Sequence, residues 1–169
     1  MDLQEALPAP SKDYLDRALK GAAHMRGLIQ DLLDYSLVGG AQNTMESVNL
    51  EDVLKEVVAQ LEVMVSSSIA TIEVGNLPTV LGNQTFLLQL FQNLIANAIK
   101  FRGEHPPMVK VFARCKGPKW IVTVKDNGAG IPSDAFDKIF GIFQRLDGGS
   151  QVEGTGIGLA LCKKNRRIT

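Results

Sequence analysis

The chain has 169 residues, of which 45% are hydrophobic and 21% are charged, which is typical of a globular protein with one domain or one domain plus a small appendage. Lys plus Arg and Asp plus Glu each number 18, and a net charge of zero argues against a nucleic-acid partner. No run of about eighteen apolar residues occurs, so no membrane contact is expected in this segment. The two cysteines, Cys115 and Cys162, lie far apart, which excludes a disulfide scaffold or a zinc finger and favours reduced thiols in a cytoplasmic protein.

The N-terminal part predicts a tail followed by a long helix. Residues 1–10 contain Pro8 and Pro10 and are expected to form a tail or linker. A helix is predicted over residues 11–40, with Ser11 as its N-cap. Its apolar residues recur in steps of three and four: Leu15, Ala18, Ala22, Met25, Ile29 and Leu32. Such a heptad seam needs a partner helix to cover it.

Residues 47–169 are expected to form a second unit, after a polar connection over residues 40–48. The predicted elements are, in chain order, a helix from Asn49 that ends at the serines 66–68, a strand at 71–74, a turn at 76–78, a helix at 84–101, strands at 108–115 and 120–125, a short helix at 133–139 and a last helix from about Gly158. Two consecutive strands exclude a simple βαβ alternation. They favour an α+β sandwich with helices on one face of a mixed or antiparallel sheet.

The helix at 84–101 carries three polar residues on one face. Asn93, Asn97 and Lys100 are spaced i, i+4 and i+7. Amide oxygens are neutral, hard ligands that suit a Mg²⁺ ion sharing phosphate oxygens, and a lysine one turn later supplies a positive charge to the same phosphates. The alternative is that the two asparagines simply face solvent, as polar residues on a helix usually do.

Residues 126–131, Asp-Asn-Gly-Ala-Gly-Ile, follow directly after a predicted strand. The ionised carboxylate of Asp126 accepts hydrogen bonds, for example from the exocyclic amine of adenine. Gly128 and Gly130 allow the backbone to approach a flat ring closely. The alternative is a hairpin turn, for which Asn-Gly is a strong signal. The next segment, however, opens with Pro132 and is predicted to be helical rather than a return strand.

A second glycine-rich stretch, residues 154–160, leads into the last predicted helix. Glycine backbone amides at a helix N-terminus favour anion binding. The stretch lacks the Gly-Lys-Ser/Thr of a P-loop, and it has Leu159 where a dinucleotide fingerprint needs a small residue. The alternative is a flexible lid that binds nothing. Taken together, the three stretches supply the groups of an ATP–Mg²⁺ site.

These three stretches and a fourth, residues 136–146, resemble the sequence boxes of sensor histidine kinases. Residues 93–101 resemble their N box, residues 126–131 their first glycine box, residues 136–146 their F box and residues 154–159 their second glycine box. Order and spacing both agree, and the resemblance extends from about residue 12 to residue 164. Phe101-Arg102 and the Phe-Gln-Arg-Leu of residues 143–146 are most similar to the phytochrome-like and PAS-linked branch.

This resemblance implies a Bergerat-type ATP-binding α/β sandwich from about residue 47, lacking its usual C-terminal strands. It implies transfer of the γ-phosphoryl group of ATP to a histidine, followed by relay to a response regulator receiver domain. Asn97 would hold Mg²⁺, Asn93 would assist, and Lys100 would lie near the phosphates. The implied nucleotide-binding residues are Asp126, Gly128, Gly130, Ile131, Gly154, Thr155, Gly156, Gly158 and Leu159. Phe140 and Phe143 would anchor the lid over the site.

Residues 11–38 resemble the second helix of the family's dimerisation hairpin, which implies a homodimer through this helix. The phosphoacceptor lies on the preceding helix in this family, so the resemblance implies a histidine-bearing helix of the parent kinase as partner and no self-phosphorylation of this chain. His24 lacks the acidic residue that would follow an acceptor and is expected to be an ordinary bundle residue. The alternatives are a non-catalytic dimerisation module with a vestigial nucleotide pocket, or another ATPase of the same superfamily.

Overall fold

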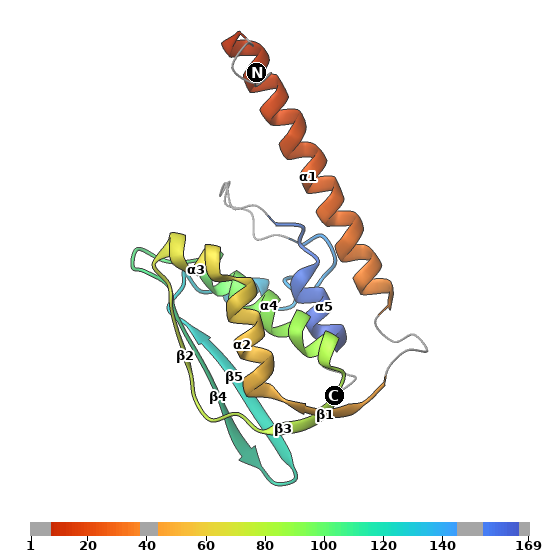
Figure 1. Cartoon of the computed structure of the whole chain (residues 1–169), viewed down its shortest axis with the longest axis vertical. Helices are drawn as coiled ribbons and strands as arrows, with labels where there is room; N and C mark the ends of the chain where they lie inside the picture. The colour runs from red at the N-terminus through yellow and green to blue at the C-terminus, as the bar shows by residue number, and fades with distance from the viewer. Residues whose placement is uncertain (1–7, 38–43, 145–153, 166–169) are drawn as a thin grey trace.

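The computed structural model describes residues 8–37, 44–144 and 154–165. It consists of a long N-terminal helix and a two-layer α/β unit (Figure 1). The elements in chain order are α1 (Ala9–Leu37), β1 (Glu46–Asn49), α2 (Leu50–Gln60), α3 (Glu62–Ser68), β2 (Thr71–Val74), β3 (Thr79–Gly82), α4 (Gln84–Lys100), β4 (Met108–Lys116), β5 (Lys119–Asp126), the 3₁₀ helix η1 (Ser133–Ala135) and α5 (Gly158–Asn165).

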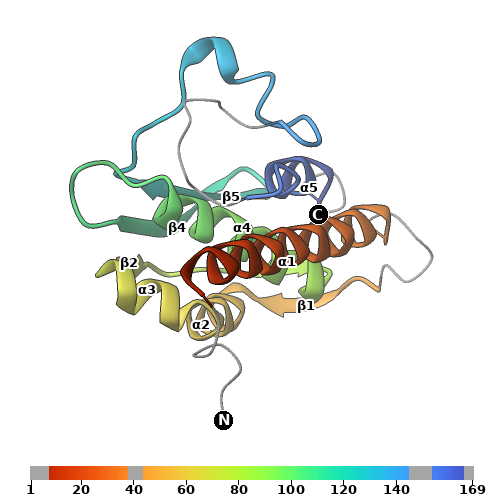
Figure 2. The ribbon, with the colours of Figure 1, turned by 90° about the horizontal axis from the view of Figure 1, so that it is seen from above.

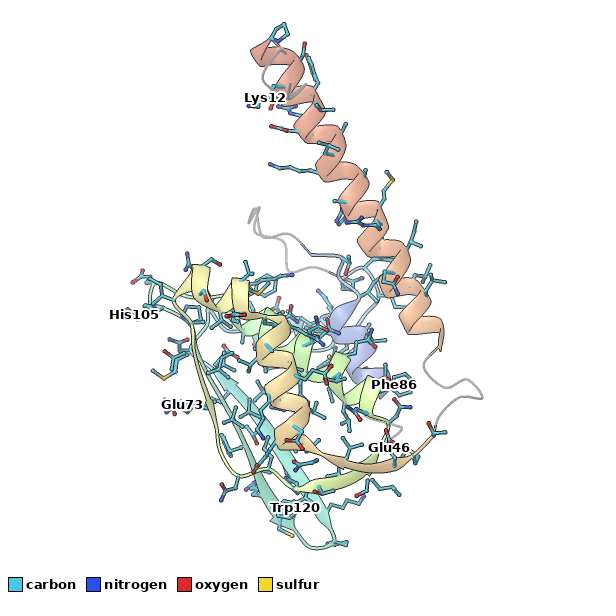
Figure 3. All side chains as sticks on the ribbon, in the orientation of Figure 1. Lys12, Glu46, Glu73, Phe86, His105 and Trp120 are labelled. Carbon is cyan, nitrogen blue, oxygen red and sulfur yellow. The ribbon has the colours of Figure 1, made fainter. Side chains whose placement is uncertain are left out.

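The larger sheet is mixed, with the order β2–β4–β5. Strand β2 runs parallel to β4, and β4 pairs antiparallel with β5, so that Val111 lies opposite both Val74 and Val124. Figure 3 shows Trp120 at the far end of the β4–β5 hairpin. Helices α2 and α4 cover one face of this sheet, which confirms the predicted α/β sandwich (Figures 1 and 2).

The core lies between the helices and the inner face of the sheet. Along β4, Val109 and Val111 are buried while Lys110 and Phe112 are exposed, as strand alternation requires. The helices contribute the other large buried side chains, which are Leu50, Val53, Leu54, Val57, Leu87, Phe91, Ile95 and Ile99. This packing fixes the orientation of α4 about its own axis, because its apolar stripe faces the core.

Helix α1 begins earlier than predicted. It starts at Ala9, so residues 9 and 10 belong to the helix rather than to the tail, and Ser11 lies inside the first turn instead of capping it. The Ser11 N–H donates to the Pro8 carbonyl at 2.9 Å. Pro10 is compatible with this start, because the first helical turn leaves its N–H groups without intrahelical partners. The predicted end at Gly39–Gly40 and residues 1–7 lie outside the described residues.

The predicted helix over 49–65 is two helices. Asn49 caps α2 as expected, its side chain accepting from the Glu51 N–H at 2.9 Å. The break falls at the buried Leu61, and α3 ends at Ser68, so the predicted helix end at the serines 66–68 is confirmed. The Ser68 hydroxyl donates to the Met64 carbonyl at 2.6 Å, which satisfies the serine without leaving the helix. The chain reverses at Ile69, which has a left-handed φ of 56°.

Three further elements differ from the predictions. Strands β1 and β3 fall in segments expected to be irregular, and they pair antiparallel with Val48 opposite Val80. The predicted short helix at 133–139 is a 3₁₀ helix over Ser133–Ala135 followed by turns. The Lys138 N–H donates to the Ala135 carbonyl at 2.9 Å and the Gly141 N–H to the Lys138 carbonyl at 2.8 Å, so i to i−3 bonds replace a continuous α-helix.

Candidate nucleotide site on helix α4

Helix α4 presents the three polar residues next to its buried stripe. The side chain of Asn83 caps the helix by accepting from the Phe86 N–H at 3.1 Å. Asn93 and Asn97 are half-buried, and Lys100 is exposed in the last turn. Neither side chain is fully exposed, and a neighbouring segment approaches the Asn93 amide.

The segment that covers Asn93 is the start of α5. A β-carbon at position 158 would lie 2.9 Å from Asn93 Oδ1, so only glycine lets the backbone come this close. Ile157 is fully buried and Leu161 is 2% exposed, and their burial holds α5 against α4. The second glycine-rich stretch therefore meets the first asparagine of α4.

The first glycine-rich stretch meets the other end of α4. The Ala129 N–H donates to the Phe101 carbonyl at 3.0 Å, and the Phe101 N–H donates to the Asn97 carbonyl at 2.9 Å. A β-carbon at position 128 would lie 2.6 Å from the Phe101 carbonyl oxygen, so Gly128 is required for this contact. Residues 126–129 thus lie at the last turn of α4, the turn that begins at Asn97.

Asp126 is exposed at the end of β5, where its Oδ1 accepts from the Gly128 N–H at 2.8 Å. This bond orients the carboxylate and leaves Oδ2 for another donor. Gly130 has φ of 75°, a conformation that L side chains rarely adopt. In the part of the chain that the structure describes, no return strand follows β5, so the hairpin alternative is wrong.

Asn127 has a structural role that the sequence analysis missed. Its Oδ1 accepts from the Met108 N–H at 2.7 Å, and its Nδ2 donates to the Pro106 carbonyl at 3.0 Å. The side chain thereby ties the start of β4 to the end of β5, and it fixes the strand end from which Asp126 projects. The Asn-Gly pair marked a turn but did not indicate which segment the amide would bind.

The aromatic segment after the first glycine-rich stretch is mostly exposed. Its exposed apolar residues are Ile131, Phe136, Phe140, Ile142 and Phe143. Figure 2 shows this segment on the side of the molecule opposite to α2 and α3. The Lys163 ammonium of α5 lies 5.5 Å from the centre of the Phe140 ring, a cation–π contact.

Two residues with positive φ join this segment to the second glycine-rich stretch. Phe143 has φ of 61° and Gly156 has φ of 73°. A β-carbon at position 156 would lie 2.9 Å from the Phe143 carbonyl carbon. Gly154, in contrast, has open space around it, and Thr155 and Leu159 are half-buried.

Helix α1 also reaches the second glycine-rich stretch, which the sequence did not indicate. A β-carbon at position 27 would lie 3.7 Å from Thr155 Cγ2, an ordinary contact distance. The Thr155 hydroxyl accepts from the Ile157 N–H at 3.4 Å, which directs its methyl group toward α1. The long helix and the start of α5 are therefore packed together.

The donor set suits a magnesium–phosphate ligand better than a protein-only metal cage. No group of three or more His, Cys, Asp or Glu side chains in the described ranges could hold a metal ion. A metal ion beside α4 would depend on the Asn93 and Asn97 amide oxygens and on oxygens of its own ligand. The close contacts at positions 128 and 158 bring the two glycine-rich stretches against Phe101 and Asn93, at the two ends of the segment that carries these amides.

Comparison with known proteins identifies the family. Residues 82–168 match the family described as histidine kinase-, DNA gyrase B-, and HSP90-like ATPase. The chain belongs to this ATPase family. Phytochrome-like protein Cph1 of Synechocystis sp. is 41% identical over 164 residues, which cover 97% of this chain and 22% of that protein. Proteins named as histidine kinases recur among its relatives, so the chain is a sensor histidine kinase catalytic domain.

Solved structures show the same fold. Full-length ShkA in complex with AMPPNP has a TM-score of 0.70 at 24% identity, covering 95% of this chain and 34% of that one. The histidine kinase ThkA in complex with the response regulator TrrA has a TM-score of 0.66 at 24% identity, covering 82% of this chain and 42% of that one.

The chain spans less than a quarter of the length of the first curated relatives it matches. None of the helices in the described ranges is long and apolar enough to cross a bilayer.

Proposed function

We propose that this kinase domain binds ATP with Mg²⁺ beside α4 and transfers the γ-phosphoryl group to a histidine supplied by another segment. The observation that carries the proposal is the convergence of the two glycine-rich stretches on opposite ends of the Asn93–Lys100 face of α4. Family membership supports ATP as the nucleotide, and the structural likeness to ShkA, which was solved with AMPPNP, agrees with it.

In this proposal the side chains of α4 handle the metal and the phosphates. Asn97 binds Mg²⁺ through its amide oxygen, Asn93 assists it, and Lys100 neutralises phosphate charge. When bound there, Mg²⁺ would supply positive charge to the phosphate oxygens. The half-buried position of both asparagines limits their rotamers, so the amides are held ready rather than ordered on binding.

The two glycine-rich stretches hold the remainder of the nucleotide. Asp126 accepts from the adenine amino group through Oδ2, because Oδ1 is already bonded to the Gly128 N–H. Gly128, Gly130 and Ile131 line the base, and Phe140 and Phe143 anchor the segment that closes over it. The backbone around the start of α5 meets the phosphates through Gly154, Thr155, Gly156, Gly158 and Leu159.

The test is a titration of the chain with a fluorescent ATP analogue, with and without Mg²⁺. We expect Asn97→Ala to abolish the Mg²⁺-dependent part of the affinity, and Asp126→Asn to weaken binding by about 10- to 100-fold, the value of a hydrogen bond to a charged group. Gln92→Ala is the matched control, since Gln92 is exposed on the same helix. Equal affinities for wild type, Asn97→Ala and Asp126→Asn would contradict the proposal.

We further propose that neither histidine of this chain accepts the phosphoryl group. His24 is exposed on α1, and His105 is exposed in the loop after α4 (Figure 3). The acceptor would be the histidine-bearing helix of the parent kinase, and a response regulator receiver domain would take the phosphoryl group next, as the ThkA–TrrA complex suggests for that pair. An acid-labile phosphate should form on the added helix and not on this chain.

We also infer two structural units, a dimerisation helix over residues 11–40 and the ATP-binding unit over residues 47–169. The seam of α1 supports a homodimer, because its apolar side chains are largely uncovered: Leu15, Leu19, Met25, Ile29, Leu32 and Leu33. Sedimentation should show a dimer that Ile29→Asp dissociates. Lys20→Asp, a charge change outside the seam, should leave the dimer intact. Dimerisation without any nucleotide effect on melting would instead favour a non-catalytic interaction module.

A further inference from the structure

A groove of about 780 Å³ lies between the α2–α3 helices and strand β2, away from the candidate nucleotide site. Leu54, Val58 and Val65 line its helical wall, and Ile72 and Val74 line its strand wall. Val74 is 44% exposed although it is β-branched and lies in a strand. The groove is therefore an apolar channel that runs beside a strand.

Strand β2 is an edge strand whose outer side is open. Its Thr71 N–H donates to the Pro107 carbonyl at 2.8 Å, and the Gly75 N–H donates to the Val111 carbonyl at 2.9 Å. Because backbone groups alternate sides along a strand, those of Ile72 and Val74 face away from β4. No described strand pairs on that side, and Figures 1 and 2 show β2 at the outer margin of the sheet.

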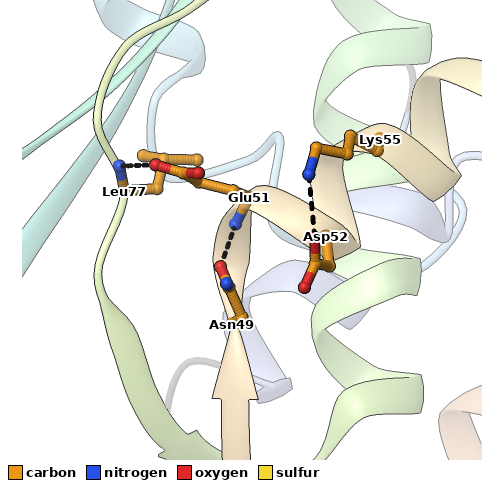
Figure 4. A network of polar contacts seen from close by, with 5 residues as sticks. All are labelled: Asn49, Glu51, Asp52, Lys55 and Leu77. Atoms are coloured by element: carbon orange, nitrogen blue, oxygen red, sulfur yellow. Dashed lines mark hydrogen bonds and ion pairs between the residues drawn. The ribbon is translucent and has the colours of Figure 1, made fainter.

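The rim of the groove carries negative charge. Glu51 and Glu62 both line it, and their separation along α2 and into α3 corresponds to at most about 16 Å at 1.5 Å per residue. The ammonium of Lys55 between them is engaged by Asp52 at 2.9 Å (Figure 4). Glu51 Oε1 accepts from the Leu77 N–H at 3.3 Å, which fixes this carboxylate at the groove. Five residues of extended chain span about the same length as the rim, at about 3.3 Å each.

We propose that this groove binds an extended peptide segment as an additional strand on β2, with apolar β-branched side chains against the helical wall and Lys or Arg at both ends near Glu51 and Glu62. The Ile72 and Val74 backbones offer two N–H donors and two carbonyl acceptors to such a strand. Main-chain bonds at an exposed sheet edge give affinity, and alternate side-chain positions give specificity. The site is independent of the nucleotide site.

The probe is the peptide acetyl-Lys-Thr-Val-Thr-Lys-amide, in which both lysines share one strand face with the valine, added to the ¹⁵N-labelled chain in an NMR titration. We expect the amide signals of Ile72 and Val74 to shift most, with a dissociation constant on the order of 0.1–1 mM. N-methylating alternate residues of the peptide gives two variants. The variant methylated at the residues whose N–H groups face β2 should not bind. The variant methylated at the other residues should bind like the unmethylated peptide. Equal loss, or no loss, for both variants would overturn strand addition.

One pair of protein variants tests the edge of β2, and a second pair tests the acidic rim. Val74→Pro removes an outward N–H without removing a bond to β4, and it should lower the affinity for the peptide at least about tenfold. Val74→Thr keeps the N–H and should leave this affinity unchanged. Glu62→Lys should lower the peptide affinity about threefold, which is the effect of one exposed ion pair. Glu56→Lys, outside the groove, should leave it unchanged. ATP-analogue affinity should be unchanged in all four, which shows that they fold. Peptide shifts confined to β5, or self-association of the chain that Val74→Pro abolishes, would overturn the proposal.

Discussion

The backbone of Gly158 lies so close to the side-chain amide of Asn93 that a β-carbon at position 158 would come within 2.9 Å of Asn93 Oδ1. This contact joins the start of α5 to the middle of α4, and it also restricts how the amide can rotate. Asn93 is therefore held between the helix that carries it and the glycine-rich stretch. A β-carbon at position 158 would therefore disturb the Asn93 amide before any nucleotide is considered.

Gly158→Ala should damage both stability and nucleotide binding. The added methyl group must displace either the Asn93 amide or the start of α5, and overpacking of this kind costs about 1–3 kcal/mol of unfolding free energy. We expect at least about a tenfold loss of affinity for an ATP analogue, equivalent to about 1.4 kcal/mol. Gly154→Ala is the matched control, because no atom lies within 4 Å of a β-carbon there. Similar losses for both variants would show that the Asn93 contact is not the cause.

Gly128→Ala should separate the first glycine-rich stretch from α4. A β-carbon at position 128 would lie 2.6 Å from the Phe101 carbonyl oxygen, and the backbone has to move because the obstructing atom is itself backbone. We expect loss of the hydrogen bond from the Ala129 N–H to the Phe101 carbonyl, seen as faster amide hydrogen exchange at Ala129. At Gly103 the nearest atom to a β-carbon is 3.6 Å away, so Gly103→Ala should exchange like wild type. Unchanged exchange in Gly128→Ala would contradict the expected displacement.

The composition of these segments was predictable from the sequence, but their contacts were not. The residue types at Asn93, Asn97 and Asp126 and the glycine runs indicate chemistry directly, and helix α4 has a strong apolar stripe that fixes its extent. The closeness of Gly158 to Asn93 depends on how α5 packs through Ile157 and Leu161, which is a tertiary relationship. Single-sequence patterns carry no record of it.

The missed elements have local reasons. Strand β1 has four residues with a single buried side chain, Val48, so it shows no alternation long enough to detect. The break between α2 and α3 falls at the buried Leu61, an apolar residue that carries no helix-breaking signal. In both cases the local sequence holds no pattern from which the feature could be predicted.

Helix α1 should influence the second glycine-rich stretch through Gly27. Gly27→Leu would extend past the β-carbon position, which is 3.7 Å from Thr155 Cγ2, and should displace α1 or the stretch. We expect faster hydrogen exchange of the Leu161 amide, which donates to the Ile157 carbonyl at 2.9 Å. Gly21→Leu is the control in the same helix, since nothing lies within 4 Å of a β-carbon there. Both variants gain about 1 kcal/mol of helix propensity, so a difference between them reports the contact alone.

Cys162 should act as a reporter of α5 opening. Burial raises the pKa of its thiol to about 12, so at pH 8 only about one molecule in 10⁴ carries the reactive thiolate. In a Cys115→Ser background, labelling by a thiol reagent should therefore be slow and should require α5 to detach. An ATP analogue with Mg²⁺ should slow it further, because binding stabilises the closed form. Labelling as fast as that of the exposed Cys115 would show that α5 does not cover the thiol.

The same thiol should make stability depend on alkaline pH. Its pKa is raised from the ordinary 9.0 to about 12 in the folded chain, so the neutral thiol favours folding below pH 9, and this contribution is lost as the pH rises toward 12. The advantage of wild type over Cys162→Ala in unfolding free energy should therefore shrink by about 2 kcal/mol between pH 8 and pH 10.5, because the unfolded thiol ionises and the folded one does not. Urea denaturation at both pH values measures this difference, and lysine titration cancels between the two proteins. A constant or growing advantage would mean that the thiol ionises as freely in the folded chain as in the unfolded one, which its burial between α5 and α4 does not allow.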